Sequence, residues 1–190
     1  LRSFERILQT DPQNSEAANA LVPIYEKEEK WHRLLQVLEI VLAHAGSDAD
    51  KIETLQRIAG VVGDRLGDRL GAFRWAAQAF ELKPDDPAVR RTLEHWAAQA
   101  DSFQELHGLY EQRLAVAVGD ERAALQRRLA RMAAENLGKL DDAVQKFEEI
   151  LEDDPGDEEA LSSLESIFRS TQQWKRLLGI SQRRLEREYD

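Results

Sequence analysis

The chain of 190 residues contains no cysteine. This absence excludes disulfide bonds, thiolate metal sites and cysteine nucleophiles together. It leaves the compartment open, because a chain without cysteine suits the cytosol and the cell envelope alike, and we slightly favour the cytoplasm. The sequence also lacks the roughly 18 uninterrupted apolar residues that a membrane span needs, and it shows no signal peptide. We therefore expect a soluble chain that does not insert into a membrane.

Positive charge is in the minority, with 26 Lys and Arg against 36 Asp and Glu and a formal net charge of −10. Non-specific binding to nucleic acid needs a basic surface, so this balance argues against a nucleic-acid partner. Hydrophobic residues make up 42% of the chain, which is too many for a disordered protein. The chain is also long enough to bury a substantial core.

Motifs that carry chemistry are scarce as well. Only four histidines occur, and none forms the His-Glu-x-x-His zinc motif. The sequence has no Gly-x-Ser-x-Gly elbow and no phosphate-binding loop. The acid run from Glu152 to Glu159 invites comparison with a calcium loop, but Pro155 breaks its alternation, so a turn with helix-capping acids is the better interpretation. We expect no metal, no cofactor and no catalytic residue, and therefore no enzyme.

What the sequence does contain is an internal repeat. Trp31, Phe103 and Trp174 stand 72 and then 71 residues apart. Self-similarity at a fixed period is typical of proteins built from stacked repeats. Each period holds two helix pairs, so the elementary repeat is about 34 to 38 residues long. Four further columns keep the same two intervals: Pro12, Pro84 and Pro155; Leu21, Leu93 and Leu164; Leu34, Leu106 and Leu177; Leu42, Leu114 and Leu185.

These residues resemble a known family. If Ser15 opens a repeat, its apolar positions fall at Leu21, Tyr25, Trp31, Leu34, Leu38 and Val41. The run from Leu137 to Ala143, followed by Phe147, Ile150 and Asp154-Pro155, has a glycine turn, an alanine, an aromatic residue and a closing Asp-Pro in order. Both patterns resemble the tetratricopeptide repeat. Leucine at 34, 106 and 177 departs from that family, which usually has alanine there, and a larger side chain should separate the paired helices slightly.

The resemblance implies an all-α fold, a right-handed superhelical solenoid of antiparallel helix pairs. We expect a single domain over residues 1–190. It would hold a partial repeat at 1–14 and repeats at 15–48, 49–86, 87–120, 121–157 and 158–190. Because the chain begins at Leu1 in mid-repeat, we expect it to be a fragment of a longer protein.

The aromatic residues divide into two groups. Trp31, Phe103 and Trp174 begin second helices, and their periodicity predicts buried rings wedged between paired helices. Trp75 and Trp96 fall outside that column. They are the better candidates for exposed contact residues, although helix packing is the favoured interpretation for both. His107 shares its column with Leu35 and Leu178, which favours a packing role for the imidazole over a metal-binding role.

The resemblance also implies a concave groove lined by the first helix of each pair. The family register places six polar candidates on it: Asn19, Lys27, Arg57, Arg91, His95 and Arg169. The arginines would give the groove local positive charge suited to a carboxylate-bearing peptide. Alternatively, they pair with neighbouring acids.

We interpret the chain as a non-catalytic scaffold for protein–protein interaction that binds a peptide or protein partner in the groove. Two alternatives remain open. The chain could be a regulatory module that senses a ligand, or an accessory repeat segment of a larger enzyme.

Overall fold

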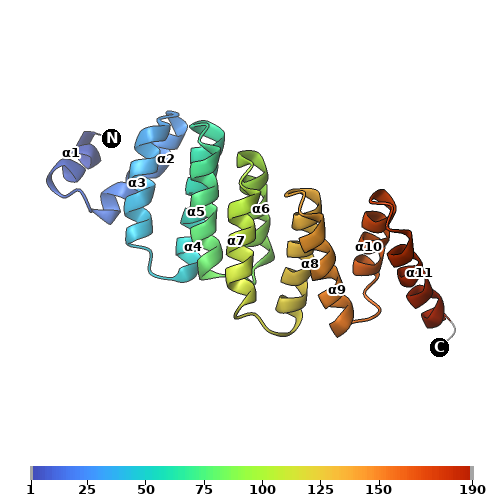
Figure 1. The fold of residues 1–190 in the computed structure, drawn as a ribbon. Coiled ribbons are helices and arrows are strands. Elements are labelled where there is room, and N and C mark those ends of the chain that lie inside the picture. Colours follow the sequence, from blue (N-terminus) through green and yellow to red (C-terminus); the bar gives the residue numbers. More distant parts are fainter. Residues whose placement is uncertain (1, 189–190) are drawn as a thin grey trace. The chain divides into compact units, whose positions relative to one another are not determined.

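The computed structural model describes residues 2–188, with side chains described through residue 185, and this part of the chain is all-α (Figure 1). It forms eleven α-helices and one π-helical turn and contains no strand, so the predicted fold class is confirmed. The elements are α1 (Arg2–Thr10), α2 (Ser15–Lys27), α3 (Trp31–Ala43), α4 (Asp48–Gly60), η1 (Val61–Arg65), α5 (Arg69–Leu82), α6 (Pro87–Ala100), α7 (Phe103–Leu114), α8 (Gly119–Glu135), α9 (Leu140–Asp153), α10 (Glu158–Ser170) and α11 (Trp174–Glu188).

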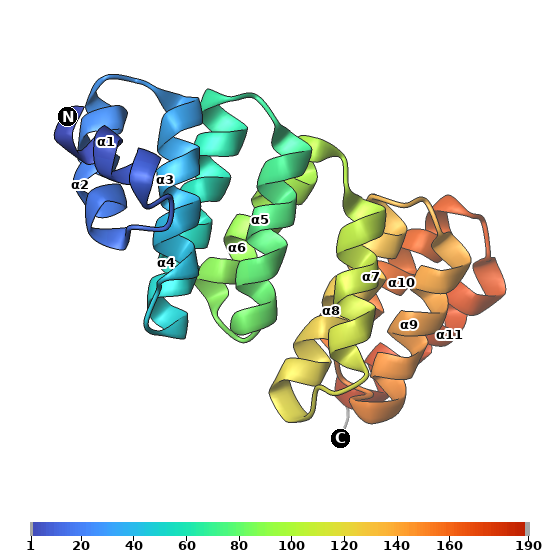
Figure 2. The same ribbon diagram turned by 90° about the vertical axis from the view of Figure 1, so that its left-hand side faces the viewer.

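The helices group into two compact units, Leu1–Ser102 and Phe103–Asp190. In the first unit α2 packs against α3, α4 against α5, and α3 against α4 (Figure 2). In the second unit α8 packs against α9 and α10 against α11. The pairs α2–α3, α4–α5, α8–α9 and α10–α11 correspond in order to the predicted repeats at 15–48, 49–86, 121–157 and 158–190. The two helices of the predicted repeat 87–120 belong to different units, and a single domain over the whole chain stays a prediction.

The repeat of 72 and 71 residues is also present in the backbone. Glu29, Asp101 and Gln172 have positive φ angles of 54°, 53° and 56°, and each ends a helix. In each case the next residue donates its N–H to the carbonyl five residues before it, at 2.8–2.9 Å. This bond satisfies one of the carbonyls left free at a helix end. Gly67 and Gly138 form a second such column, with φ angles of 76° and 64° that glycine adopts without strain.

The starts of the helices that follow the proline column are capped by side chains. Asn14 accepts a hydrogen bond from the Ala17 N–H at 2.9 Å, and Asp157 accepts one from the Ala160 N–H at 2.8 Å. Asp86 stands at the same place before α6 and caps it in the same way. The acid run before α10 therefore contains a helix cap, as the sequence predicts.

The leucine columns supply much of the core. Leu21, Leu93 and Leu164 are fully buried, as are Leu34 and Leu106. In the second unit the buried cluster is built mainly from residues of α9 and α10: Ala143, Val144, Phe147, Ile150, Leu151, Ala160, Leu161, Leu164, Ile167 and Phe168. Each helix of a pair thus buries its apolar stripe against its partner, which is the main stabilising force for amphipathic helices.

The aromatic column is only partly buried, which corrects one prediction. Trp31 and Phe103 are half-buried, but the Trp174 side chain is 60% exposed. The prediction of a buried ring is wrong for Trp174, because no described helix packs on that face of α11. Trp96 is only 5% exposed, so helix packing, the favoured interpretation, is confirmed for it and a contact role is excluded. Trp75 is half-buried.

The π-helical turn η1 explains how the Trp96 ring is accommodated. The turn η1 follows α4 without a break, so the chain is helical from Asp48 to Arg65. Gly63 lies inside η1, is buried, and faces the six-membered ring of the Trp96 indole. A Cβ atom at residue 63 would overlap that ring. Absence of a side chain therefore allows α6 to approach this turn.

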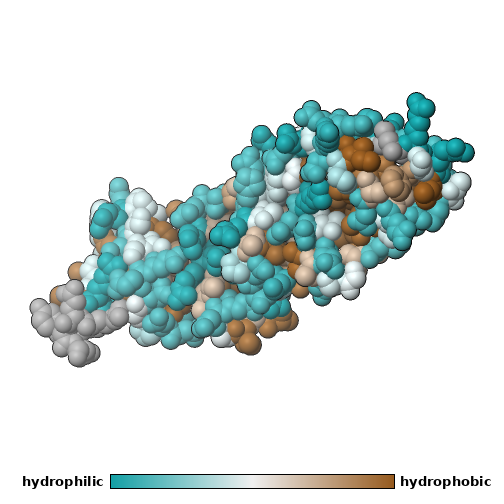
Figure 3. All heavy atoms as spheres, turned by 180° about the vertical axis from the view of Figure 1, so that it is seen from behind, coloured by the Kyte–Doolittle hydropathy of each residue, from teal (hydrophilic) through white to brown (hydrophobic). Residues whose placement is uncertain are grey.

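The surface agrees with the acidic, charged composition. Figure 3 shows a face that is mostly hydrophilic, with apolar side chains gathered over the region of α1. Phe4 and Ile7 of α1 are each more than one-third exposed. Within residues 2–188, no helix is long and apolar enough to cross a membrane.

Candidate functional site

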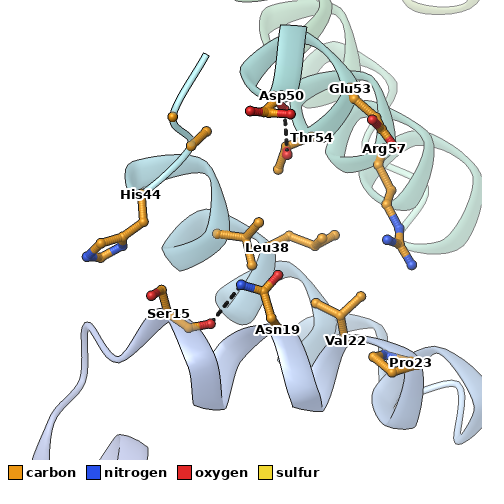
Figure 4. A pocket seen from close by; sticks show the side chains of 13 residues that line it. Ser15, Asn19, Val22, Pro23, Leu38, His44, Asp50, Glu53, Thr54 and Arg57 are labelled. Carbon is orange, nitrogen blue, oxygen red and sulfur yellow. Dashed lines mark hydrogen bonds between the residues drawn. The ribbon is translucent and has the colours of Figure 1, made fainter. Parts of the chain in front are cut away.

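A cavity of about 580 Å³ lies in the first unit between α2, the end of α3, and α4 (Figure 4). It is lined by the first helices of two neighbouring pairs, which is where the family resemblance implies a groove. The lining combines a small apolar part with amide, hydroxyl and charged groups: Ser15, Asn19, Val22, Pro23, Leu38, Val41, His44, Ala45, Gly46, Asp50, Glu53, Thr54 and Arg57.

On the α2 side, Asn19 and Pro23 face the cavity one turn apart. The Asn19 side-chain amide donates to the Ser15 carbonyl at 2.8 Å, and this bond uses the amide nitrogen rather than the amide oxygen. Pro23 has no N–H, so the Asn19 carbonyl lacks the usual helical donor four residues later. The helix nevertheless continues through Pro23 to Lys27. The α2 wall thus presents acceptor groups beside the buried apolar side chain of Val22.

On the α4 side, Asp50, Thr54 and Arg57 recur every three to four residues and so share one helix face. Ser47 begins α4 by accepting the Asp50 N–H at 3.1 Å and donates its own hydroxyl to the Asp50 carboxylate at 2.7 Å. The Thr54 hydroxyl donates to the Asp50 carbonyl at 2.8 Å. Glu53 completes the wall. These local bonds hold the polar side of the cavity in place.

The positive charge of Arg57 is offset by a neighbour. Its guanidinium forms an ion pair with the Glu26 carboxylate of α2 at 2.7 Å, across the two first helices. For this arginine, the alternative of pairing with an acid is therefore the right one. Glu53 has no ion pair among the described residues. The Asp50 carboxylate accepts a hydrogen bond from the hydroxyl of Ser47, which caps α4, and likewise has no ion pair among the described residues. The cavity is consequently acidic rather than basic.

The other candidates from the sequence lie elsewhere. Lys27 is exposed at the end of α2 and does not line the cavity. Arg91 and His95 are exposed on α6, where the His95 ring meets the Trp96 ring edge-on with centroids 4.9 Å apart. Arg169 is exposed on α10, in the second unit. The structure thus brings together Asn19 and Arg57, while a groove role for all six residues stays a prediction.

The sequence prediction missed Asp50 and Glu53, although a signal for them existed. They precede Arg57 by seven and four residues on the same helix, in the register that selected Arg57. The candidates were selected for positive charge or an amide group, which passed over both acids.

His107 is the buried histidine of the second unit, and its packing role is confirmed by an exposure of 4%. Its Nδ1 lies 3.6 Å from a Glu111 carboxylate oxygen and its Nε2 lies 4.0 Å from Asp142. Burial lowers the pKa of His107 from 6.5, and the nearby cations Lys146 and Lys139 act in the same direction against the two acids. The imidazole is therefore held in its neutral form. Among residues 2–188, no group of three or more His, Asp or Glu could hold a metal ion.

Comparison with known proteins relates the chain to helical-repeat structures. No family model and no curated protein matches it. Two crystal structures of MamA are similar, each with a TM-score of 0.51. The first is 16% identical over 89% of this chain and 95% of that chain, and the second is 15% identical over 92% of each. TTC0263, a thermophilic TPR protein in Thermus thermophilus, overlaps more loosely, with 19% identity over 87% of each chain and a TM-score of 0.43. At such identities the likeness concerns the fold alone, and with the repeated helix pairs it makes this chain an all-α protein of tetratricopeptide-like fold.

Proposed function

We propose that the chain is a non-catalytic protein-interaction module that binds an extended peptide segment of a partner protein in the cavity between α2 and α4. The observation that carries this proposal is an open cavity lined by the first helices of two stacked pairs. In Figure 4 the side chains of Asn19, Glu53 and Arg57 border the space between these helices. A volume of about 580 Å³ suits one or two side chains of a peptide.

The cavity offers a peptide both polar and apolar contacts. The Asn19 amide can accept a hydrogen bond from a peptide N–H, as an amide oxygen has two lone pairs. Val22 and Leu38 supply the apolar part of the lining. Extended peptides present backbone amides and side chains together, so a mixed lining of this kind fits them better than it fits an apolar ligand.

The charge of the cavity favours a basic peptide side chain, lysine or arginine. Asp50 and Glu53 lie on one wall, while Arg57 is offset by Glu26. A cationic group entering the cavity meets carboxylates, and electrostatic complementarity of this kind selects partners and speeds association.

The competing hypothesis is an acidic peptide held by Arg91 and His95, which are both exposed on α6.

The test is selection of binding peptides from a displayed library of random sequence, followed by calorimetric titration of the selected peptides. Selected peptides should be rich in lysine or arginine. Glu53→Lys should weaken their binding at least about tenfold, a loss of 1.4 kcal/mol or more. Glu39→Lys is the matched control, because Glu39 is an exposed acid on α3 outside the cavity. It should change affinity less than about twofold.

Two results would contradict the proposal. One is a library that yields no peptide. The other is a set of acidic peptides whose binding survives Glu53→Lys and is lost in the double variant Arg91→Glu, His95→Glu. The second result would place the peptide site on α6, as the sequence-based hypothesis has it. Circular dichroism of each variant checks that the helices remain folded.

A further inference from the structure

A second cavity lies in the first unit, on the other side of Glu53 from the peptide cavity. It has a volume of about 420 Å³ and lies between α4, the end of α5 and the turn that leads into α6. We call it the α4–α6 cavity. Its lining consists of Asp48, Ala49, Ile52, Glu53, Gln56, Leu82, Lys83 and Asp86.

Glu53 lies at the border between the two cavities. An α-helix turns by about 100° per residue, so Ile52 and Gln56 share one face of α4, while Asp50 and Arg57 share another. Glu53 lies between these faces and lines both cavities (Figure 4). The α4–α6 cavity therefore adjoins the peptide cavity along α4.

The lining of the α4–α6 cavity is acidic. It holds the carboxylates of Asp48, Glu53 and Asp86 against one ammonium group, that of Lys83. Lys83 lies 3.2 Å from Asp86, and Asp48 forms a similar pair with Lys51 at 3.3 Å. Both lysine side chains are exposed, and exposed pairs of this kind are weak. A cation that enters the cavity therefore meets carboxylates that are only loosely paired.

The second unit contains a copy of this place. Helix α9 begins and ends 71 residues after α5, at 140 against 69 and at 153 against 82. At the same interval Asp157 follows Asp86, and each of them caps the helix that comes next. In this register Gln56 of α4 corresponds to Arg127 of α8.

An arginine of the chain itself crosses this place in the second unit. Arg127 donates from Nε to the Asp157 carboxylate at 2.7 Å and so links α8 to the start of α10. In the first unit the acid is retained as Asp86, but the arginine is replaced by Gln56, whose side chain has no hydrogen-bond partner among the described residues. The position that supplies the arginine in one copy is thus present in the other and does not supply it.

We propose that the α4–α6 cavity is a binding pocket for an arginine side chain of a partner protein. The guanidinium takes the place that Arg127 has in the second unit and meets Asp86 and Glu53. It displaces the exposed Lys83 from Asp86, because a guanidinium offers five N–H donors in a fixed fork, whereas an ammonium acts as a point charge.

The remaining residues of the lining suit the rest of an arginine side chain. Ala49, Ile52 and Leu82 can contact its methylene groups, and Leu82 is 38% exposed without a ligand. The amide oxygen of Gln56 can accept one further N–H. The inference rests on the proposed function in one respect, that the arginine belongs to a partner protein, and the pocket itself can be tested without any peptide.

The probe for the test is N-acetyl-L-arginine amide, a single arginine without charged ends. It is titrated into the ¹⁵N-labelled chain. The signals followed by NMR are the side-chain amide of Gln56 and the backbone N–H groups of Ala88 and Val89, which donate to Asp86. We expect saturable shifts with a dissociation constant on the order of 1 mM, as suits so small a ligand.

Two matched probes test the chemistry of the ligand. N-acetyl-L-citrulline amide has nearly the same shape but no charge, and it should bind at least about tenfold more weakly. N-acetyl-L-lysine amide keeps the charge but lacks the fork of donors, and it should bind at least about threefold more weakly.

Four variants test the place of binding. Gln56→Arg copies the second unit, fills the pocket from inside and should abolish the shifts. Asp86→Asn removes the charge but keeps a good capping residue, and it should weaken binding at least about tenfold. Asp85→Asn is the matched control, because Asp85 is exposed and outside the lining, and it should change affinity less than about twofold. Lys83→Gln removes the competing ammonium and should strengthen binding about twofold or more.

Three results would overturn the inference: no saturable shift with the arginine probe, equal binding of the lysine or citrulline probe, and undiminished binding in Gln56→Arg. Circular dichroism checks that each variant is folded, and Asp86→Asn decides the matter if Gln56→Arg is not. Failure of the proposed function looks different. In that case the peptide library yields no binder, while the arginine probe still shifts the Ala88 and Val89 signals.

Discussion

Replacement of Gly63 by alanine tests the contact between η1 and α6. In most helices this change stabilises a protein, because glycine loses more backbone freedom on folding than alanine, a gain of about 0.5–1 kcal/mol. At residue 63 we expect the opposite. The added methyl would overlap three carbons of the Trp96 indole, which is itself only 5% exposed and has little room to move.

The size of the effect follows from these two opposing terms. Overpacking of a closed core typically costs about 1–3 kcal/mol, and the overlap here involves a rigid ring rather than the end of a flexible chain, so we take the upper half of that range. Subtracting the gain in backbone entropy leaves a net loss of about 1–2.5 kcal/mol. Gly60 is the matched control. It lies one turn earlier, and a Cβ built there meets nothing within 4 Å, so Gly60→Ala should stabilise the chain.

The measurement is urea unfolding followed by tryptophan fluorescence and circular dichroism. Three of the four tryptophans lie in the first unit, so fluorescence reports mainly on the unit that holds Gly63. Trp96→Leu in the Gly63→Ala background should restore part of the loss, which a double-mutant cycle detects as a coupling of at least about 1 kcal/mol. Equal stability of Gly63→Ala and Gly60→Ala, or strict additivity in the cycle, would refute the packing of this turn against α6.

Three further predictions concern burial, backbone strain and protonation. Trp96→Ala should lower the free energy of unfolding by about 3–5 kcal/mol, whereas Trp174→Ala should lower it by less than about 1 kcal/mol; similar losses in urea unfolding would show that one of the two burial assignments is wrong. Gln172→Gly should raise the melting temperature, because it relieves a positive φ of 56° worth about 1 kcal/mol; a lower melting temperature would contradict this. Burial lowers the pKa of the His107 imidazole in the folded chain from 6.5. As the pH drops below 6.5 the unfolded chain therefore binds a proton at His107 first, and the free energy of unfolding should fall. The same titration of His107→Leu should show a shallower fall, and parallel curves would contradict a buried neutral imidazole.

Much of the fold was predictable because repeats encode local structure. The turns at Gly67 and Gly138 and the leucines at 21, 93 and 164 recur at the predicted interval and behave alike, since each depends on its own helix pair. The prediction of a buried ring fails at Trp174, because the burial of the residues in its column depends on a helix outside their own pair. Helix packing was expected for Trp96, but the sequence could not show where the ring packs, because its space is made by Gly63, 33 residues earlier, and no local pattern links the two.

The candidate site shows the same division between what is local and what is not. The resemblance to the repeat family implied that Asn19 and Arg57 face the groove, and both line the cavity. Register does not report charge, because the net charge of a surface depends on which side chains pair across helices. Arg57 reaches Glu26, 31 residues earlier, and this ion pair offsets the positive charge of Arg57, so that Asp50 and Glu53 set the charge of the cavity. An arginine counted from sequence attracts a carboxylate only while it is unpaired, so under the proposed peptide function the charge of a bound peptide would be set by Glu53, which has no ion pair among the described residues.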